Sequence, residues 1–96
     1  MTDKVVLITG GSRGLGRAMA LGFAAAGADL AISSRKLESC EETAREVEAL
    51  GKRALPVACH VGYWEQCDRL VDTVYDTYGK VDVLINNAGM SPIYDR

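Results

Sequence analysis

The sequence is poor in the residue types that build several common kinds of functional site. Its one histidine, His60, and its three cysteines, Cys40, Cys59 and Cys67, form no Cys-x-x-Cys pair and no spacing typical of metal ligands. We interpret the cysteines as small buried apolar side chains in a reducing compartment. The sequence therefore predicts neither a metal centre nor a disulfide-linked fold.

Long apolar runs and an excess of basic residues are also missing. No apolar run approaches the roughly 18 residues that a membrane span requires. The chain has 11 basic and 13 acidic residues and a formal net charge of −2, whereas nucleic-acid and membrane-surface proteins usually carry a basic excess. The first residues lead straight into an apolar run with no visible signal peptide. We expect a cytoplasmic protein without nucleic-acid or membrane partners.

Short apolar runs alternate with helical segments along the chain. The strand-like runs are residues 5–9, 29–33, 54–59 and 81–85. The helical segments are residues 15–26, 36–50 and 63–78, and a glycine that stops the helix follows each one. This alternation predicts an α/β fold in which right-handed βαβ units build a doubly wound parallel sheet. The expected strand order is 3-2-1-4, with helices on both faces.

Two of the helical segments show an apolar residue at every third or fourth position. In segment 36–50 the predicted buried residues are Leu37, Cys40, Ala44, Val47 and Leu50. In segment 63–78 they are Cys67, Leu70, Val71, Val74 and Tyr78. The third strand contains Pro56, whose nitrogen carries no hydrogen, so we expect this strand at an edge of the sheet.

A glycine-rich segment connects the first strand to the first helix. Such a turn brings backbone N–H groups and the positive end of a helix dipole together, which predicts a phosphate site. The spacing of Gly11 and Gly16 matches a P-loop, but Arg17 and Ala18 stand where a P-loop has lysine and a hydroxyl residue. The P-loop interpretation fails on these two residues. The strict GxGxxG pattern also fails, because position 19 is methionine.

Two segments resemble signatures of the short-chain dehydrogenase/reductase family. Residues 9–16 read Thr-Gly-x-x-x-Gly-x-Gly, similar to that family's TGxxxGxG, and residues 86–89 read Asn-Asn-Ala-Gly, similar to its NNAG. The resemblance covers residues 4–89 and implies a Rossmann-type fold that binds NAD or NADP for hydride transfer to a carbonyl or from an alcohol. It implies that the cofactor-binding residues are Gly10, Ser12, Arg13, Gly14, Leu15, Gly16, Asn87, Ala88 and Gly89. Thr9 and Asn86 either share that role or only tie the two loops together.

The end of the second strand predicts which dinucleotide is bound. An acidic residue at this place selects NAD by binding the ribose 2′-hydroxyl. The sequence instead has Ser34 and Arg35, while Asp29 lies at the other end of the strand. A guanidinium suits a 2′-phosphate, and cations at a helix N-terminus oppose the dipole unless an anion is present. We therefore expect NADP, with Arg13 as a second cation; the alternative is that Arg35 and Lys36 form a solvated helix start.

The chain departs from the resembled family after its third strand. Members usually carry an Asp-Val pair whose carboxylate accepts a hydrogen bond from adenine, and here the pair is His60-Val61. A neutral imidazole can accept one hydrogen bond, so His60 either contacts adenine or is a helix-start residue.

The catalytic residues of the resembled family have no match in the chain. These are a serine, a Tyr-x-x-x-Lys pair and a further asparagine, and no tyrosine here has a lysine four residues later. We interpret residues 1–96 as the N-terminal part of one NAD(P)-binding domain in a protein of about 250 residues. The resemblance implies a homo-oligomeric enzyme with a small carbonyl or alcohol substrate. The alternative is a non-catalytic dinucleotide-binding sensor or partner module.

Overall fold

A computed structural model describes residues 2–10, 14–59 and 64–86. The elements are β1 (Val5–Thr9), α1 (Gly14–Ala25), β2 (Asp29–Ser34), α2 (Leu37–Ala49), β3 (Ala54–Ala58), α3 (Trp64–Tyr78) and β4 (Val83–Asn86). Each element coincides with a segment that the sequence pattern predicts, apart from small shifts at the ends. The glycines that follow the three helices, Gly27, Gly51 and Gly79, all have positive φ, which confirms their role as helix stops.

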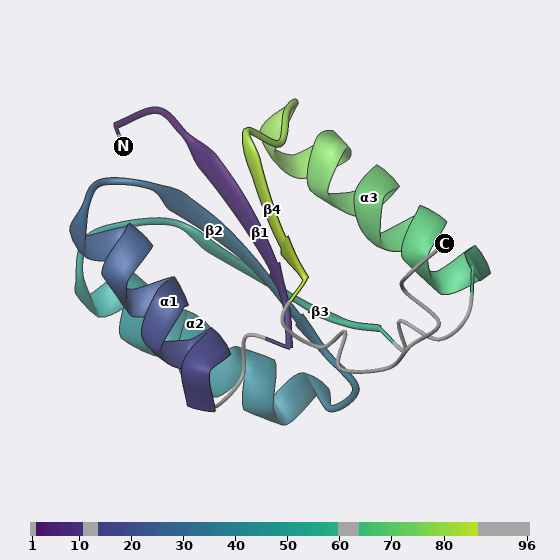
Figure 1. Ribbon diagram of the computed structural model, residues 1–96, viewed down its shortest axis with the longest axis horizontal. Helices are drawn as coiled ribbons and strands as arrows, with labels where there is room; N and C mark the ends of the chain where they lie inside the picture. The colour runs from purple at the N-terminus through teal and green to yellow at the C-terminus, as the bar shows by residue number, and fades with distance from the viewer. Residues whose placement is uncertain (1, 11–13, 60–63, 87–96) are drawn as a thin grey trace.

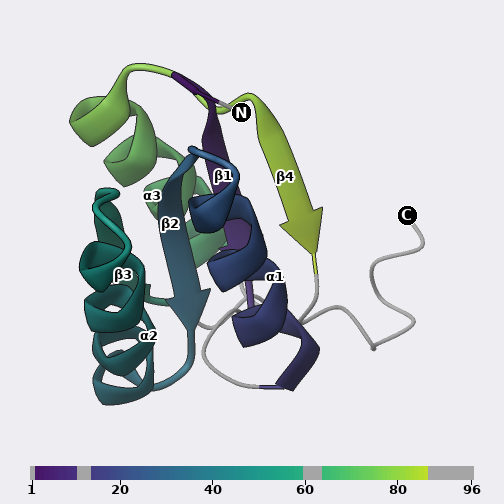
Figure 2. The same ribbon diagram turned by 90° about the vertical axis from the view of Figure 1, so that its left-hand side faces the viewer.

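The strands form one parallel sheet in the order β3-β2-β1-β4. Helices α1 and α2 cover one face, and α3 covers the other (Figures 1 and 2). The predicted doubly wound fold and strand order are therefore confirmed. After β3 the chain returns to the far side of β1, so the carboxyl ends of β1 and β4 border the topological switch point, where ligands bind in such sheets.

The core has two layers, one on each face of the sheet. Because the inner strands are covered on both faces, their side chains are apolar in an almost unbroken run. The layer under α1 and α2 contains Val6, Ile8, Ala20, Ala24, Ala28, Leu30, Ile32, Cys40 and Val47. The layer under α3 contains Val5, Leu7, Ala31, Cys59, Leu70 and Val74. Cys40 and Cys59 are buried thiols that form no disulfide within the described residues, as interpreted from the sequence, whereas the side chain of Cys67 lies outside the described part.

Three residues that the apolar pattern predicted as buried are exposed. On α3 the buried stripe runs through Leu70 and Val74, and Val71, one position beside it, is 40% exposed. Leu37 and Leu50 are also exposed, because they stand at the first residue and the C-cap of α2 and so have helix neighbours on one side only. The pattern also missed Thr43, a buried polar residue of α2.

The start of β4 lies two residues later than the sequence pattern predicts. The backbone N–H of Val5 donates to Asp82 Oδ2 at 2.8 Å instead of to a strand carbonyl, so the ladder with β1 begins only at Val83. This hydrogen bond, followed by one from Lys80, lowers the pKa of Asp82. The Asp82 side chain therefore takes the place of a strand carbonyl just before β4, while the Asp82 N–H donates to the Val5 carbonyl at 2.9 Å.

The two edges of the sheet differ in how well they are protected. The N–H of Cys59 donates to the Ser34 carbonyl at 2.7 Å, and alternate residues of a strand point the same way, so Pro56 faces away from β2. The predicted edge position of Pro56 is thus confirmed, and it weakens that edge as a pairing site. β4 forms the other edge, has neither proline nor charge, and leaves Leu84 61% exposed.

Candidate cofactor site

The carboxyl ends of three strands meet where the sequence predicts the ligand. Thr9, the last residue of β1, pairs in register with Ser33 of β2 on one side and with Asn86 of β4 on the other. The glycine loop, the β2–α2 turn and the end of β4 therefore lie next to one another at the carboxyl end of the sheet.

The described part of the glycine loop needs glycine for its conformation. Gly10 and Gly14 have φ angles of 74° and 62°, in the region that side chains rarely adopt. The N–H of Gly10 donates to the Ser33 carbonyl at 2.6 Å, which fixes where the loop leaves β1. Helix α1 begins at Gly14 without an acidic residue in its first turn, so no carboxylate of that turn competes for the N-terminal N–H groups. Gly16 is buried, whereas Leu15 is 67% exposed beside it.

Thr9 and Asn86 are joined directly. The Thr9 hydroxyl donates to Asn86 Oδ1 at 2.8 Å, and Thr9 Oγ1 also lies 3.4 Å from the carbonyl oxygen of Ile85. This contact ties the ends of β1 and β4 through side chains. Among the described residues, no acceptor binds the Asn86 amide hydrogens.

The turn between β2 and α2 is held by Ser34. Its hydroxyl donates to the Lys36 carbonyl at 3.0 Å, accepts the Lys36 N–H at 3.3 Å and lies 3.0 Å from Cys40 Sγ. Burial, the largest cause, raises the pKa of the Cys40 thiol, against the hydrogen bonds from Ser34 that lower it. Ser34 therefore shapes the turn, and its hydroxyl must release the Lys36 carbonyl before it can donate to a ligand.

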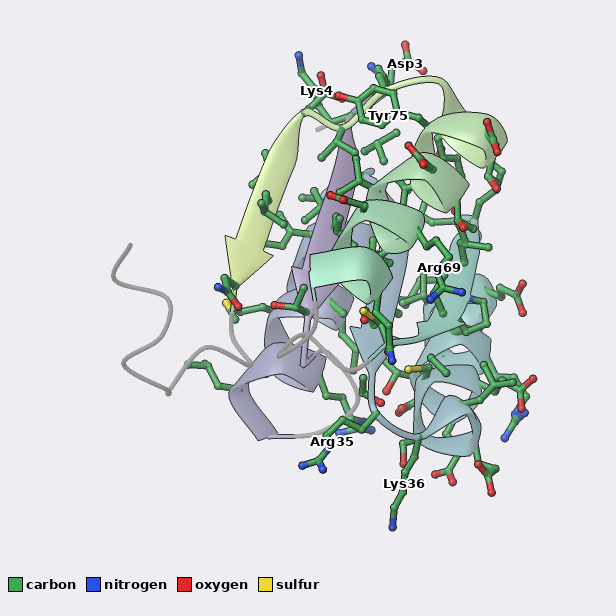
Figure 3. The ribbon with its side chains drawn as sticks, turned by 90° about the vertical axis from the view of Figure 1, so that its right-hand side faces the viewer. Asp3, Lys4, Arg35, Lys36, Arg69 and Tyr75 are labelled. Carbon is green, nitrogen blue, oxygen red and sulfur yellow. The ribbon has the colours of Figure 1, made fainter. Side chains whose placement is uncertain are left out.

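Arg35 and Lys36 stand exposed at the start of α2 and point outward at the carboxyl end of the sheet (Figure 3). Lys36 occupies the N-cap position, and no side chain caps the helix by a hydrogen bond. Within residues 2–10, 14–59 and 64–86, no carboxylate forms an ion pair with either cation. Glu38 stands in the first turn of α2 but forms no ion pair with either cation within the described residues. A helix start with two unpaired cations is an arrangement that an anion stabilises.

The acidic residue of β2 lies at the amino end of the strand, opposite to the carboxyl end where Arg35 follows. Asp29 begins the strand, accepts the Arg53 N–H at 3.0 Å and forms an ion pair with the Arg53 guanidinium at 2.8 Å. Burial acts to raise the pKa of Asp29, but the hydrogen bonds from Arg53 outweigh it and lower the pKa. Asp29 is therefore a structural partner of Arg53 and lies far along the strand from the predicted ribose position.

Two further residues have structural roles that exclude rival interpretations. Arg17, which stands where a P-loop has its lysine, pairs with Glu46 and links α1 to α2. Tyr78 donates its hydroxyl to the Leu30 carbonyl at 2.8 Å beneath Arg53, and burial above all raises its pKa to about 12. An acid–base tyrosine needs a lowered pKa, so Tyr78 is unsuited to that role.

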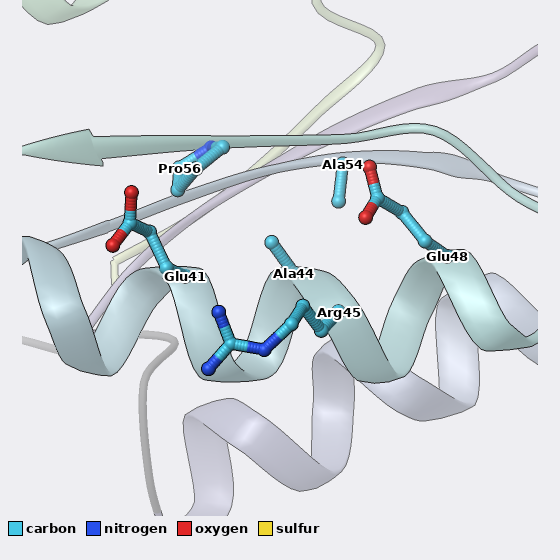
Figure 4. A pocket seen from close by; sticks show the side chains of 6 residues that line it. All are labelled: Glu41, Ala44, Arg45, Glu48, Ala54 and Pro56. Carbon is cyan, nitrogen blue, oxygen red and sulfur yellow. The ribbon is translucent and has the colours of Figure 1, made fainter.

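The described residues offer no other site of comparable chemistry. A pocket of about 250 Å³ lies between α2 and β3, away from the carboxyl ends of β1 and β4 (Figure 4). Its lining residues are Glu41, Ala44, Arg45, Glu48, Ala54 and Pro56. In the part of the chain that the structure describes, no cluster of histidine, cysteine or acidic residues is suited to a metal ion. No helix in that part is long and apolar enough to cross a membrane.

The structure describes six of the thirteen residues that the sequence predicts to bind the cofactor. These are Gly10, Gly14, Leu15, Gly16, Ser34 and Arg35, which stand at or beside the carboxyl ends of β1 and β2. The other seven lie outside the described residues: Ser12, Arg13, His60, Val61, Asn87, Ala88 and Gly89. Sequence reasoning assigned no role to Ser33, whose hydroxyl is buried without a hydrogen-bond partner among the described residues. A serine inside an apolar strand gives no periodic or motif signal.

Comparison with known proteins decides the family. The family model described as short chain dehydrogenase matches residues 4–95. The chain belongs to the short-chain dehydrogenase family. This confirms the resemblance, and the family uses nicotinamide dinucleotide cofactors. Relatives that it matches include proteins named as an oxidoreductase and as a dehydrogenase.

Individual relatives show how much of a short-chain dehydrogenase the chain represents. The uncharacterized oxidoreductase MT0954 of Mycobacterium tuberculosis is 43% identical over 93% of this chain and 34% of its own length. The chain thus spans about a third of the length of the relatives it matches. The Pseudomonas aeruginosa RhlG/NADP complex is 32% identical, with a TM-score of 0.86 over 98% of this chain and 38% of that one. NAD⁺-bound xylitol dehydrogenase is also 32% identical, with a TM-score of 0.84 over 86% of this chain and 32% of that one. These two complexes differ in cofactor, so likeness of fold leaves the choice between NAD and NADP to the residues at the site.

Proposed function

We propose that the intact protein transfers a hydride between NADP(H) and a small carbonyl or alcohol substrate, and that this chain is its cofactor-binding part. A nicotinamide dinucleotide supplies the hydride chemistry when it is bound. The residues present fit such a group: a glycine turn leads into a helix without an acidic first turn, and two cations without an ion-pair partner among the described residues stand at the end of β2. In this proposal the protein is cytoplasmic and homo-oligomeric.

The observation that carries the cofactor preference is the environment of Arg35. It follows the last residue of β2, it is exposed, and the carboxylate of its strand, Asp29, is paired with Arg53 at the other end. A planar guanidinium binds a phosphate through two parallel hydrogen bonds, which a ribose 2′-hydroxyl cannot match. In the proposed complex Arg35 holds the 2′-phosphate, and the α1 N-terminus holds the pyrophosphate.

A binding experiment with the intact protein tests this preference. We expect NADPH to bind at least about tenfold tighter than NADH in a fluorescence titration, because one charge-assisted hydrogen-bond pair distinguishes the ligands. Arg35→Ala is expected to remove most of this difference by weakening NADPH alone. Arg45→Ala is the matched control, since Arg45 is an exposed arginine on α2, the helix that follows Arg35, beside the α2–β3 pocket. Equal affinities for both cofactors, or an Arg35→Ala variant that keeps the preference, would contradict the proposal.

The alternative of a non-catalytic dinucleotide sensor follows from the lack of Tyr-x-x-x-Lys in these 96 residues. Both functions require the same cofactor site. NADPH oxidation by the intact protein across a panel of carbonyl compounds separates them. Turnover with any member of the panel supports the oxidoreductase, and tight NADPH binding without turnover supports the sensor.

A further inference from the structure

Ser33 differs from the other buried polar residues of the described chain. Its side chain is fully buried, and its hydroxyl has no hydrogen-bond partner within the described residues. Thr9 is also buried but donates to Asn86, and Thr43 takes part in an interaction of its own. A buried polar group without a partner destabilises a fold, and such groups are rare, so this hydroxyl calls for an explanation.

The position of Ser33 connects it to the proposed cofactor site. It pairs in register with Thr9, and its carbonyl accepts the Gly10 N–H at 2.6 Å, so it adjoins the start of the glycine loop. Arg35 follows two residues later in the chain. Side chains alternate along a strand, which places Ser33 on the same face of β2 as Ala31, in the layer under α3. The unpartnered hydroxyl therefore lies at the carboxyl end of β2, between the two segments proposed to hold phosphates.

Without a ligand, alanine at position 33 would make the fold more stable than this serine does. It has nearly the same volume, keeps the backbone bond to Gly10 and leaves no polar atom unsatisfied. No described residue forms a hydrogen bond with the hydroxyl. Ligands bind at the carboxyl end of a doubly wound sheet, which makes a ligand, or a water molecule that the ligand holds, the candidate partner.

We propose that the Ser33 hydroxyl is a cofactor-binding group that obtains its hydrogen bond only when the dinucleotide is bound, directly or through one ordered water. This inference rests on the proposed function. Because Arg35 is assigned to the 2′-phosphate, the part of the cofactor nearest to Ser33 is the adenosine, which NADPH, NADH and ADP share. Ser33 thus contributes to affinity for all three ligands, whereas Arg35 selects among them.

Ser33→Ala in the intact protein tests the proposal through two measurements: cofactor affinity, which is expected to fall, and thermal stability, which is not. The dissociation constants of NADPH, NADH and ADP are expected to rise together by about fivefold to tenfold, as for the loss of one hydrogen bond. The NADPH-to-NADH preference stays as in the wild type. The Tm of the cofactor-free variant is expected to be equal to or higher than that of the wild type, because an unsatisfied polar group is removed. A residue with only a structural role would lower Tm and leave affinity unchanged.

Thr43→Val is the matched control, since Thr43 is a buried hydroxyl on α2 that already has an interaction. It is expected to lower Tm without changing cofactor affinity. Unchanged affinity of Ser33→Ala for all three ligands would overturn the inference while leaving the proposed function intact, and so would an affinity loss accompanied by a lower Tm. A wild-type protein that binds no dinucleotide would refute the proposed function and this inference with it.

Discussion

At the scale of single residues, the amino and carboxyl ends of the strands carry different kinds of side chain. The amino end carries paired charges: Asp29 holds Arg53, and Asp82 accepts the Val5 N–H beside Lys80. The carboxyl end carries glycine, hydroxyl groups and the unpaired Arg35. Charges that are paired within the fold stabilise it, whereas Arg35, which has no ion-pair partner within the described residues, is available to an anionic ligand.

The Asp29–Arg53 pair predicts how stability depends on pH. The folded pKa of Asp29 is lowered, so the pair stabilises the fold fully above the ordinary aspartate pKa, and this contribution is lost as pH falls below about 4. Asp29→Asn is expected to lower Tm by roughly 5 °C at pH 7, and the difference from the wild type should shrink in acid. Thermal unfolding between pH 7 and pH 3 measures this. Asp76→Asn, an exposed carboxylate on α3, is the control, and a difference that persists unchanged at pH 3 would contradict the assignment.

At the scale of elements, α1 shows how backbone conformation and composition act together. It starts at Gly14 with a positive φ and continues through Gly22, an exposed interior position. A Cβ at either glycine would meet no atom within 4 Å, so only φ distinguishes the two positions. The glycine pattern therefore marks the turn at Gly14 and not every glycine of the helix.

This pair of glycines makes a matched test of the loop conformation. Gly14→Ala is expected to destabilise the fold by about 1–2 kcal/mol, because φ is 62° and the left-handed region disfavours a Cβ. Gly22→Ala is expected to stabilise it by about 0.5–1 kcal/mol, the usual gain inside a helix. Urea unfolding of both variants measures the two changes. A stabilising Gly14→Ala would show that the turn does not require the conformation seen here.

At the scale of the whole molecule, the two edges of the sheet differ: among residues 2–10, 14–59 and 64–86, one edge is protected and the other is open. Pro56 lies on the β3 edge, whereas β4 has neither proline nor charge and exposes Leu84. Open apolar edges pair with other chains. We therefore expect the 96-residue chain, expressed by itself, to be marginally folded or self-associating and without reductase activity.

Leu84→Lys tests the role of this edge in self-association. A charge on an exposed edge strand opposes pairing, so the variant is expected to sediment as a smaller species than the wild-type 96-residue chain. Leu50→Lys is the control, because Leu50 is an exposed leucine at the end of α2. A wild-type chain that is monomeric, unfolds cooperatively and turns over substrate would refute the expectation.

The sequence by itself determined the order of elements, the parallel sheet, the glycine turn and the family. These features follow from local pattern: apolar runs, helix-stopping glycines and two short motifs, each contained in a few neighbouring residues. Tertiary structure alone decided that Val71 is exposed while Thr43 is buried, that Arg17 and Asp29 are committed to Glu46 and Arg53, and that the Ser33 hydroxyl is left without a partner. The physical reason is that burial and pairing depend on residues distant in the chain, brought together only when the sheet and its helices pack.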